Sequence, residues 1–214
     1  MLAVKQSSLP RQAHGQEPVV WTQILLPDVN LAVWQRQVPE LVGAFASALL
    51  GQGKALSESH AIDLHDNLQA VDLAQLASTY ADLAGYQEFL ADVAWLVSAY
   101  GYLLGARRVG LRLRALEQSM CPRFHVDHVP VRLITTYSGV ASEWLAEGAM
   151  CRSQLGKPAA EPTDRTHIRQ LMPGDVALLK GEKWLGNEGA AIIHRSPPPP
   201  EGSRRLLLTV DWLQ

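Results

Sequence analysis

The stretch VGLRLR at residues 109–114 marks the point where the sequence changes from a helical to a strand-like pattern. Its apolar residues occupy every second position and alternate with glycine and arginine. Side chains of an extended chain point to opposite faces in turn, so this alternation predicts a half-buried strand. Apolar residues before the stretch recur every three or four positions, whereas those after it form short runs. The stretch therefore divides the chain into two halves of different secondary structure.

Three segments of the first half have the apolar spacing of amphipathic helices. The strongest covers residues 86–104, and a second covers residues 73–83, with Asp72 as its N-cap and a glycine as its stop. A third covers residues 39–51 and begins with a proline, which a first helical turn tolerates. Residues 1–106 are therefore predicted to be mainly helical and to pack on the structure formed by the second half.

The second half, residues 107–214, is predicted to form strands joined by turns. After VGLRLR, the clearest strand segments are residues 131–137, 166–172, 175–181, 190–194 and 205–212. No helical pattern separates them, which favours antiparallel pairing. Residues 147–165 are polar and contain proline, which predicts a mobile loop. The predicted fold class is α+β, with a jelly-roll or cupin-like β-barrel in the second half packed on the N-terminal helices as one structural unit.

The overall composition is that of an ordinary globular protein and excludes several classes of function. The chain has 214 residues, of which 47% are hydrophobic and 19% are charged. A net charge of -2 provides no electrostatic field that would gather nucleic acid or an anionic membrane. The N-terminus lacks the apolar run of a secretory signal, and no uninterrupted apolar stretch reaches about 18 residues. We therefore expect a cytoplasmic protein.

The segment CPRFHVDHVPVR at residues 121–132 places metal-binding residue types inside a strand-like stretch. His125 and Asp127 are two positions apart, so their side chains point to the same face, whereas His128 points to the other. One strand can therefore supply an imidazole nitrogen and a carboxylate oxygen to one ion. His194, which ends an apolar run before a rigid proline turn, is the candidate third ligand. Two histidines and one carboxylate form the facial triad of non-haem Fe(II) oxygenases, which leaves coordination positions open.

An arginine on the last predicted strand is suited to bind a co-substrate at such a site. An α-keto diacid on the metal needs a buried cation for its far carboxylate, and arginine contacts a carboxylate through two N–H groups. Arg204 and Arg205 are adjacent, and strand alternation allows only one of them to face inward. We expect Arg205, because Leu207 and Thr209 share its face; if Arg204 faces inward instead, the co-substrate assignment moves to it.

The order of these residues resembles the 2-oxoglutarate- and Fe(II)-dependent dioxygenase superfamily, whose members have a double-stranded β-helix. His194 follows His125 after 69 residues, and Arg205 follows after 11 more. The final stretch RLLLTVDW is similar to the last strand of the prolyl hydroxylase branch. The resemblance implies that the three ligand candidates bind Fe(II) and that Arg205 binds 2-oxoglutarate with help from Tyr137. The resemblance covers residues 107–214. It implies that the protein hydroxylates a substrate, either a small molecule or a protein, but it does not identify that substrate.

Four phrases of the second half look like those of an uncharacterised bacterial family, domain of unknown function 1826. The phrases are CPRFHVDHVPVRLITTY, SEWL, LLKGE and HRSPP. This resemblance supplies no activity. It associates the family with zinc homeostasis and therefore leaves zinc open as the metal.

Two other interpretations of the same residues stay open. A cupin-like zinc protein without oxygenase chemistry, or a zinc-dependent hydrolase in metal homeostasis, would use the same three ligands and one water, and a thiolate from Cys121 would favour zinc. Alternatively, the H-x-D pair is structural and no metal binds. Cys121 and Cys151 are expected to be reduced, because a disulfide framework needs more cysteines. An aromatic stripe in residues 86–104 is either core or a homodimer surface.

Overall fold

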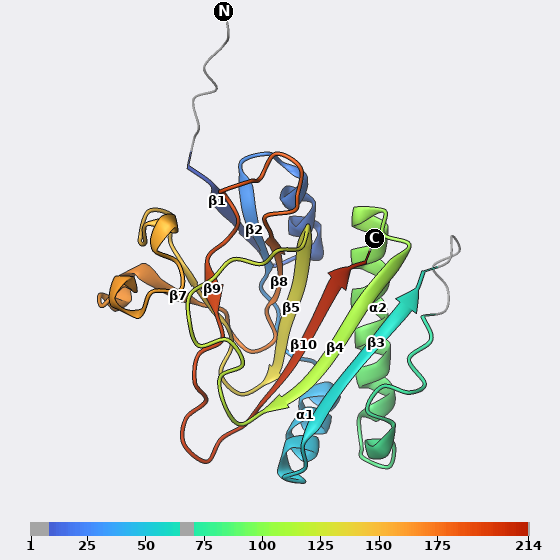
Figure 1. The fold of residues 1–214 in the computed structure, drawn as a ribbon. Helices are drawn as coiled ribbons and strands as arrows, with labels where there is room; N and C mark the ends of the chain where they lie inside the picture. The colour runs from blue at the N-terminus through green and yellow to red at the C-terminus, as the bar shows by residue number, and fades with distance from the viewer. Residues whose placement is uncertain (1–8, 65–70, 214) are drawn as a thin grey trace, which may run out of the picture.

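The computed structural model describes residues 9–64 and 71–213, and the strands in these residues form one large and one small sheet (Figure 1). The described large sheet has seven strands in the order β1-β2-β8-β5-β10-β4-β3. Their bounds are β1 Arg11–Gly15, β2 Val29–Trp34, β3 Leu56–Asp63, β4 Arg108–Leu116, β5 Val131–Ser138, β8 Val176–Lys180 and β10 Arg205–Trp212. The small sheet has the order β7-β6-β9, with bounds β6 Glu143–Leu145, β7 Ile168–Gln170 and β9 His194–Arg195.

In the described part of the chain, the helices α1 (Glu40–Gly51) and α2 (Tyr86–Leu104) cover one face of the large sheet (Figure 1). Both were predicted from their apolar spacing, and α1 begins directly after Pro39. The Tyr100 hydroxyl ties α2 to the sheet by donating a 2.7 Å hydrogen bond to the backbone oxygen of Val131. Helices and sheets together confirm the predicted α+β class. None of the described helices has the length and apolar character needed to cross a membrane.

The opposite face of the large sheet packs against the small sheet and forms a second core. Its buried apolar residues are Leu31, Val33, Ile134, Ala141, Trp144, Leu171, Ala177, Leu179, Ile192 and Leu207. Strand alternation explains the division, because in β10 Leu206 and Leu208 enter the helix-facing core, whereas Leu207 enters this second core. The alternate positions of β10 from Arg205 to Asp211 therefore face the space between the sheets.

The described residues of the first half form strands as well as helices, which the prediction for residues 1–106 did not include. Strands β1, β2 and β3 come from this half and belong to the same large sheet as strands from the second half. β3 pairs with β4, and β2 pairs with β8. The sequence pattern does not reveal β2 because VNLAVW is buried along nearly its whole length, and a short apolar run does not distinguish a strand from a buried helix. The two halves share one sheet.

Residues 73–83 do not form the predicted α-helix. They form turns and one 3₁₀ segment, η2 (Ser78–Tyr80), and Ala77 adopts a left-handed conformation with φ 48° that interrupts any helix. The glycine predicted as a stop is Gly85, whose φ is 84°. A Cβ atom at this position would overlap the backbone oxygen of Leu41, so the close approach of the two segments requires glycine.

The strands predicted in the second half are present, and the pairs among them are antiparallel. Two are shorter than predicted, because residues 166–172 contribute only β7 and residues 190–194 contribute only the first residue of β9. The remaining 3₁₀ segments are η1 Pro18–Leu25, η3 Arg152–Gln154, η4 Pro158–Ala160 and η5 Arg165–His167. Residues 147–165, predicted as a loop, contain η3 and η4, and their apolar side chains pack around Phe124 on the outer face of the small sheet.

Candidate metal centre

The two candidate histidine ligands face each other across a single backbone bridge. The amide of His125 donates to the oxygen of His194 at 3.0 Å, and the amide of His194 donates to the oxygen of His125 at 2.9 Å. This antiparallel bridge joins residues that are 69 positions apart, and their imidazole centroids lie 4.5 Å apart. Strand β9 and the extended segment before β5 therefore hold the two rings beside each other.

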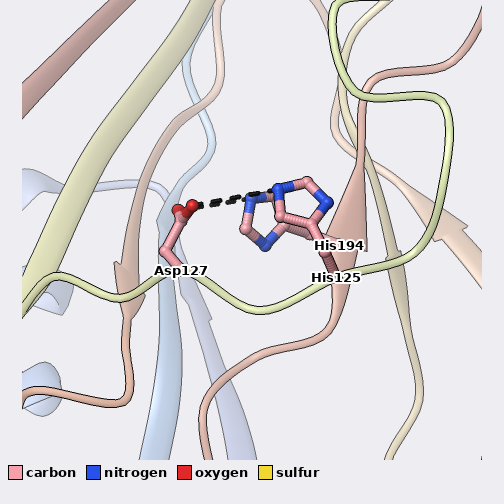
Figure 2. A group of neighbouring side chains, drawn as sticks. All are labelled: His125, Asp127 and His194. Carbon is pink, nitrogen blue, oxygen red and sulfur yellow. Dashed lines mark ion pairs between the residues drawn. The ribbon is translucent and has the colours of Figure 1, made fainter. Parts of the chain in front are cut away.

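Asp127 completes the group of side chains (Figure 2). Its Oδ2 lies 3.4 Å from Nε2 of His194, and its Oδ1 lies 3.8 Å from Nε2 of His125. The ligand atoms that the three residues offer all lie within 4.8 Å of one another. Metal–nitrogen and metal–oxygen bonds are about 2.0–2.2 Å long, so the ligands of one ion lie roughly 3–4 Å apart. Small side-chain shifts would therefore suffice to bind one ion.

The hydrogen bonds of both imidazoles leave their Nε2 atoms free. Nδ1 of His125 lies 2.9 Å from the backbone oxygen of Arg123, and Nδ1 of His194 lies 3.3 Å from that of Ile192. A carbonyl oxygen only accepts hydrogen bonds, so we assign the proton to Nδ1 and the lone pair to Nε2 in each ring. Burial lowers the pKa of His194 to about 4, which keeps this ring neutral at pH 7.

The carboxylate of Asp127 has one oxygen engaged and one free. Oδ1 accepts a 2.7 Å hydrogen bond from NH1 of Arg132, whereas Oδ2 is buried without a hydrogen-bond partner among the described residues. A buried carboxylate oxygen without a partner costs free energy unless something else binds it. Because this oxygen lies beside Nε2 of His194, the donor set fits a divalent transition-metal ion.

Arg205 is fully buried, and its hydrogen bonds go to hydroxyl groups. Its NH1 donates to Ser196 Oγ at 3.1 Å, and its NH2 donates to Thr136 Oγ1 at 3.0 Å and to Ser142 Oγ at 3.1 Å. Within the described chain its Nε has no hydrogen-bond partner. Burial lowers the pKa of Arg205 to about 10, and no carboxylate among the described residues opposes this shift. A buried cation in this setting is suited to bind an anion.

Arg204 points away from this region. Its Nε lies 3.2 Å from Oε1 of Glu117. Its NH1 and NH2 donate to the backbone oxygens of Leu50 and Lys54 at 3.2 and 2.7 Å. Arg204 therefore caps the C-terminal end of α1. Of the two adjacent arginines, Arg205 is the one that faces the space between the sheets.

A cavity between the sheets connects the histidines with the hydroxyl groups around Arg205. Its lining includes His125, His194, Arg132, Ser142, Ser196, Ile134, Leu207 and Thr209. Ser142 and Ser196 both line the cavity and accept hydrogen bonds from Arg205. A molecule in this cavity can therefore contact His125, His194 and the serine hydroxyls that accept hydrogen bonds from the buried cation.

Tyr137 does not lie at the site, which corrects its predicted role beside Arg205. Its hydroxyl donates a 2.7 Å hydrogen bond to Oδ2 of Asp92, and its ring packs against Phe89, both on α2. Alternation along β5 puts Tyr137 on the helix-facing side of the sheet and its neighbour Thr136 on the other side. Thr136 therefore makes the contact with Arg205 that was expected of Tyr137.

Sequence reasoning missed the hydroxyl residues that hold the guanidinium group. The sequence could have identified Thr136, because strand alternation along β5 places its side chain on the face opposite to Val131 and Leu133. It could not have identified Ser142 and Ser196, since no spacing distinguishes them from other serines. His128, set aside because it is out of phase with the pair, is exposed. Cys121 lines the cavity but does not belong to the group of metal-ligand candidates.

Comparison with protein families gives one match over most of the chain. The profile of a family described as "Protein of unknown function (DUF1826)" matches residues 15–211. No curated protein matches the chain. The family description names no activity, so it adds no chemistry to the site.

Solved structures with a similar fold include a prolyl-4-hydroxylase and a bsmA homologue. A prolyl-4-hydroxylase from Pseudomonas putida is 14% identical, with a TM-score of 0.50 over 92% of this chain and 97% of its own. A bsmA homologue from Methylobium petroleophilum PM1 is 13% identical, with a TM-score of 0.52 over 95% and 94% of the two chains. A dioxygenase for auxin oxidation in rice is 13% identical, with a TM-score of 0.48 over 96% and 83%. At these identities the first two matches establish a shared fold but do not identify an activity for this chain.

Proposed function

We propose that this chain, which belongs to the DUF1826 family of proteins of unknown function, is an Fe(II)- and 2-oxoglutarate-dependent dioxygenase-like enzyme that hydroxylates an unidentified substrate. One observation carries the proposal. His125 and His194, which form a group with Asp127, share a cavity with the serines that hold Arg205, a buried cation bonded to hydroxyls. Neither half of this arrangement would suffice alone, because the first accounts for a metal and the second for an anion.

The chemistry of 2-oxoglutarate matches both halves of the cavity. Its keto-acid end can chelate a metal through two oxygens, and its distal carboxylate needs a cation. The unpartnered Nε of Arg205 and the hydroxyls of Ser142 and Ser196 are donors suited to that carboxylate. Thr136 would hold the guanidinium in place from the side of β5.

We propose that His125, Asp127 and His194 hold Fe(II) through Nε2, Oδ2 and Nε2. Three protein ligands leave coordination positions open for other molecules. Bound iron and 2-oxoglutarate would supply the oxidising chemistry, in which dioxygen is reduced, 2-oxoglutarate is decarboxylated to succinate and a substrate C–H bond is hydroxylated. The chain would hold the ligand geometry and, through apolar walls such as Ile134 and Leu207, limit the access of water.

We also propose that the two facing sheets are the layers of a double-stranded β-helix and form one structural unit. The position of the cavity between the large and small sheets supports this assignment. The shared large sheet supports a single unit, because strands from residues 1–106 and 107–214 pair with one another.

Anaerobic titration of 2-oxoglutarate into the Fe(II)-loaded protein tests the proposed activity. The readout is the visible absorption that develops when a keto acid chelates Fe(II). Wild type is expected to bind, whereas Arg205→Met is expected not to, because the apolar side chain offers the carboxylate no donor. Arg204→Met is the matched control and should bind as wild type does, since Arg204 faces away. Absence of binding in metal-loaded wild type, or equal binding by Arg205→Met, would overturn the proposal.

One observation favours a second candidate, a zinc protein without oxygenase chemistry. Cys121 is a free, partly exposed thiol in the cavity wall, and thiolates prefer zinc to Fe(II). Zinc would take the same three ligands and one water in a tetrahedral arrangement. Metal analysis of protein purified without chelators distinguishes the two candidates. Stoichiometric zinc that Fe(II) does not displace, together with no affinity for 2-oxoglutarate, would support the zinc protein.

A further inference from the structure

Arg132 lies behind the candidate metal centre and joins two carboxylates. Its NH1 donates to Oδ1 of Asp127 at 2.7 Å, and its Nε and NH2 donate to Oδ1 and Oδ2 of Asp211 at 2.7 and 2.9 Å. Asp211 is buried and also accepts a hydrogen bond from Arg112. Arg132 and Asp211 lie directly opposite each other in the pairing of β5 with β10. The register of the large sheet therefore sets the position of the guanidinium group.

The contact with Arg132 limits how Asp127 can bind a metal. Oδ1 is engaged in a hydrogen bond between two charged groups, which is stronger than one between neutral groups. Rotation of the carboxylate to bring both oxygens toward an ion would break this bond. Only Oδ2 is free, and it lies 3.4 Å from Nε2 of His194. Asp127 is thereby prepared to act as a ligand through a single oxygen.

We propose that Arg132 is a positioning residue of the metal centre, which holds Asp127 as a one-oxygen ligand and is itself held by Asp211. The inference rests on the proposed function only in requiring a metal at His125, Asp127 and His194. It does not require that the metal be iron or that 2-oxoglutarate binds.

Two consequences for the site follow from this arrangement. A carboxylate bound through both oxygens would occupy one more coordination position, so the one-oxygen mode keeps that position open for an incoming ligand. The positive charge of Arg132 also offsets part of the negative charge of Asp127, while Asp211 and Arg112 balance each other behind it. The protein thus tunes the ligand through a residue that does not touch the metal.

Binding of Co(II) to the complete chain tests the proposal, because the visible absorption of Co(II) reports its coordination as well as its affinity. Arg132→Lys keeps a cation but cannot bridge two carboxylates as the planar guanidinium does. It is expected to weaken Co(II) binding by about 10- to 100-fold and to change the absorption, because Asp127 becomes free to bind through both oxygens. Arg112→Lys is the matched control, since Arg112 contacts Asp211 but not Asp127, and should leave affinity and absorption as in wild type.

The outcomes separate this inference from the proposed function. Arg132→Lys with wild-type Co(II) affinity and absorption would overturn it, and a circular-dichroism melt of each variant ensures that folded protein is compared. Arg132→Met removes the charge as well; if it does not fold, Arg132→Lys decides alone. Co(II) binding by wild type without 2-oxoglutarate binding would overturn only the co-substrate proposal. Failure of wild type to bind Co(II) would overturn the metal centre and this inference together.

Discussion

Two arginines face the space between the sheets, Arg205 fully buried and Arg132 partly buried, and their surroundings differ in charge. Arg132 on β5 contacts the carboxylates of Asp127 and Asp211. Arg205 on β10 contacts three hydroxyl groups, and no described carboxylate forms an ion pair with it. Asp211 lies near the end of the strand that Arg205 begins, so the two environments lie toward opposite ends of β10. Arg132 is therefore paired with carboxylates, whereas Arg205 is bonded to hydroxyl groups.

The pKa values of the two groups reflect this difference. Burial disfavours the charge of both side chains, but the hydrogen bonds that Arg132 donates to Asp211, together with the negative charges of Asp127 and Asp211, raise the pKa of Arg132 above its ordinary value. Burial alone lowers the pKa of Arg205 to about 10. An arginine that is paired with carboxylates of the protein is already neutralised. An arginine without such partners is stabilised when an anionic ligand binds beside it. The comparison indicates that Arg132 is paired within the fold, whereas Arg205 has no acidic partner among the described residues.

The largest expected effect comes from removing the paired cation. Arg132→Met leaves Asp127 and Asp211 buried without their shared partner, and breaking a buried pair in this way costs about 3–5 kcal/mol. We expect the lower end of that range, because Arg112 still contacts Asp211. Urea unfolding of the metal-free variant measures the change. A loss of stability as small as that caused by a surface substitution would contradict the role assigned to Arg132.

The next effect concerns the unpaired cation and separates stability from ligand binding. Arg205→Met should stay within about 1 kcal/mol of wild type, because relief from burying a charge offsets the lost hydrogen bonds. At a 2-oxoglutarate concentration 100 times its Kd, the metal-loaded wild type should gain about 2.7 kcal/mol of stability, and the variant should gain none. Thermal melts with and without the ligand measure both quantities. If 2-oxoglutarate stabilised wild type and Arg205→Met equally, Arg205 would not be the cation that binds the ligand.

The smallest effect uses two adjacent threonines that differ in their partners. Thr136 accepts a hydrogen bond from Arg205, whereas the hydroxyl of Thr135 is buried without a described partner. Thr136→Val should therefore cost about 1–2 kcal/mol, while Thr135→Val should be neutral or stabilising, since it removes an unsatisfied polar group. Urea unfolding of both variants supplies the comparison. The opposite order of stabilities would show that the hydroxyl groups do not support Arg205.

Part of the fold and of the candidate site could be predicted because it depends on the period of one segment. The spacing of three and four predicts α2, a short apolar run predicts β10, and strand alternation along that run predicts the inward orientation of Arg205. The same counting along β5 would have assigned Thr136 rather than Tyr137 to the inward face. Residues 73–83 have helical spacing but form turns, because the left-handed Ala77 interrupts them.

Other parts could not be predicted, because they depend on which strands become neighbours. Arg132 ends the same segment that contains the candidate ligands, yet its partner Asp211 lies 79 residues away. Ser142 and Ser196, which contact Arg205, are separated from it by 63 and 9 positions in the sequence, and no spacing pattern distinguishes either serine. No local pattern encodes these contacts.

The sequence by itself determined the secondary structure of the most regular segments and the face on which each of their side chains lies, because both are properties of a short stretch of backbone. It thereby selected Arg205 as the inward arginine, and the spacing of two positions selected His125 and Asp127 as a pair although they lie outside the named strands. The tertiary structure decided that β1, β2 and β3 share one sheet with the second half, that His194 bridges to His125, and that Arg132 is neutralised while Arg205 is not. These outcomes depend on strand order and register, which arise only when distant segments pack together.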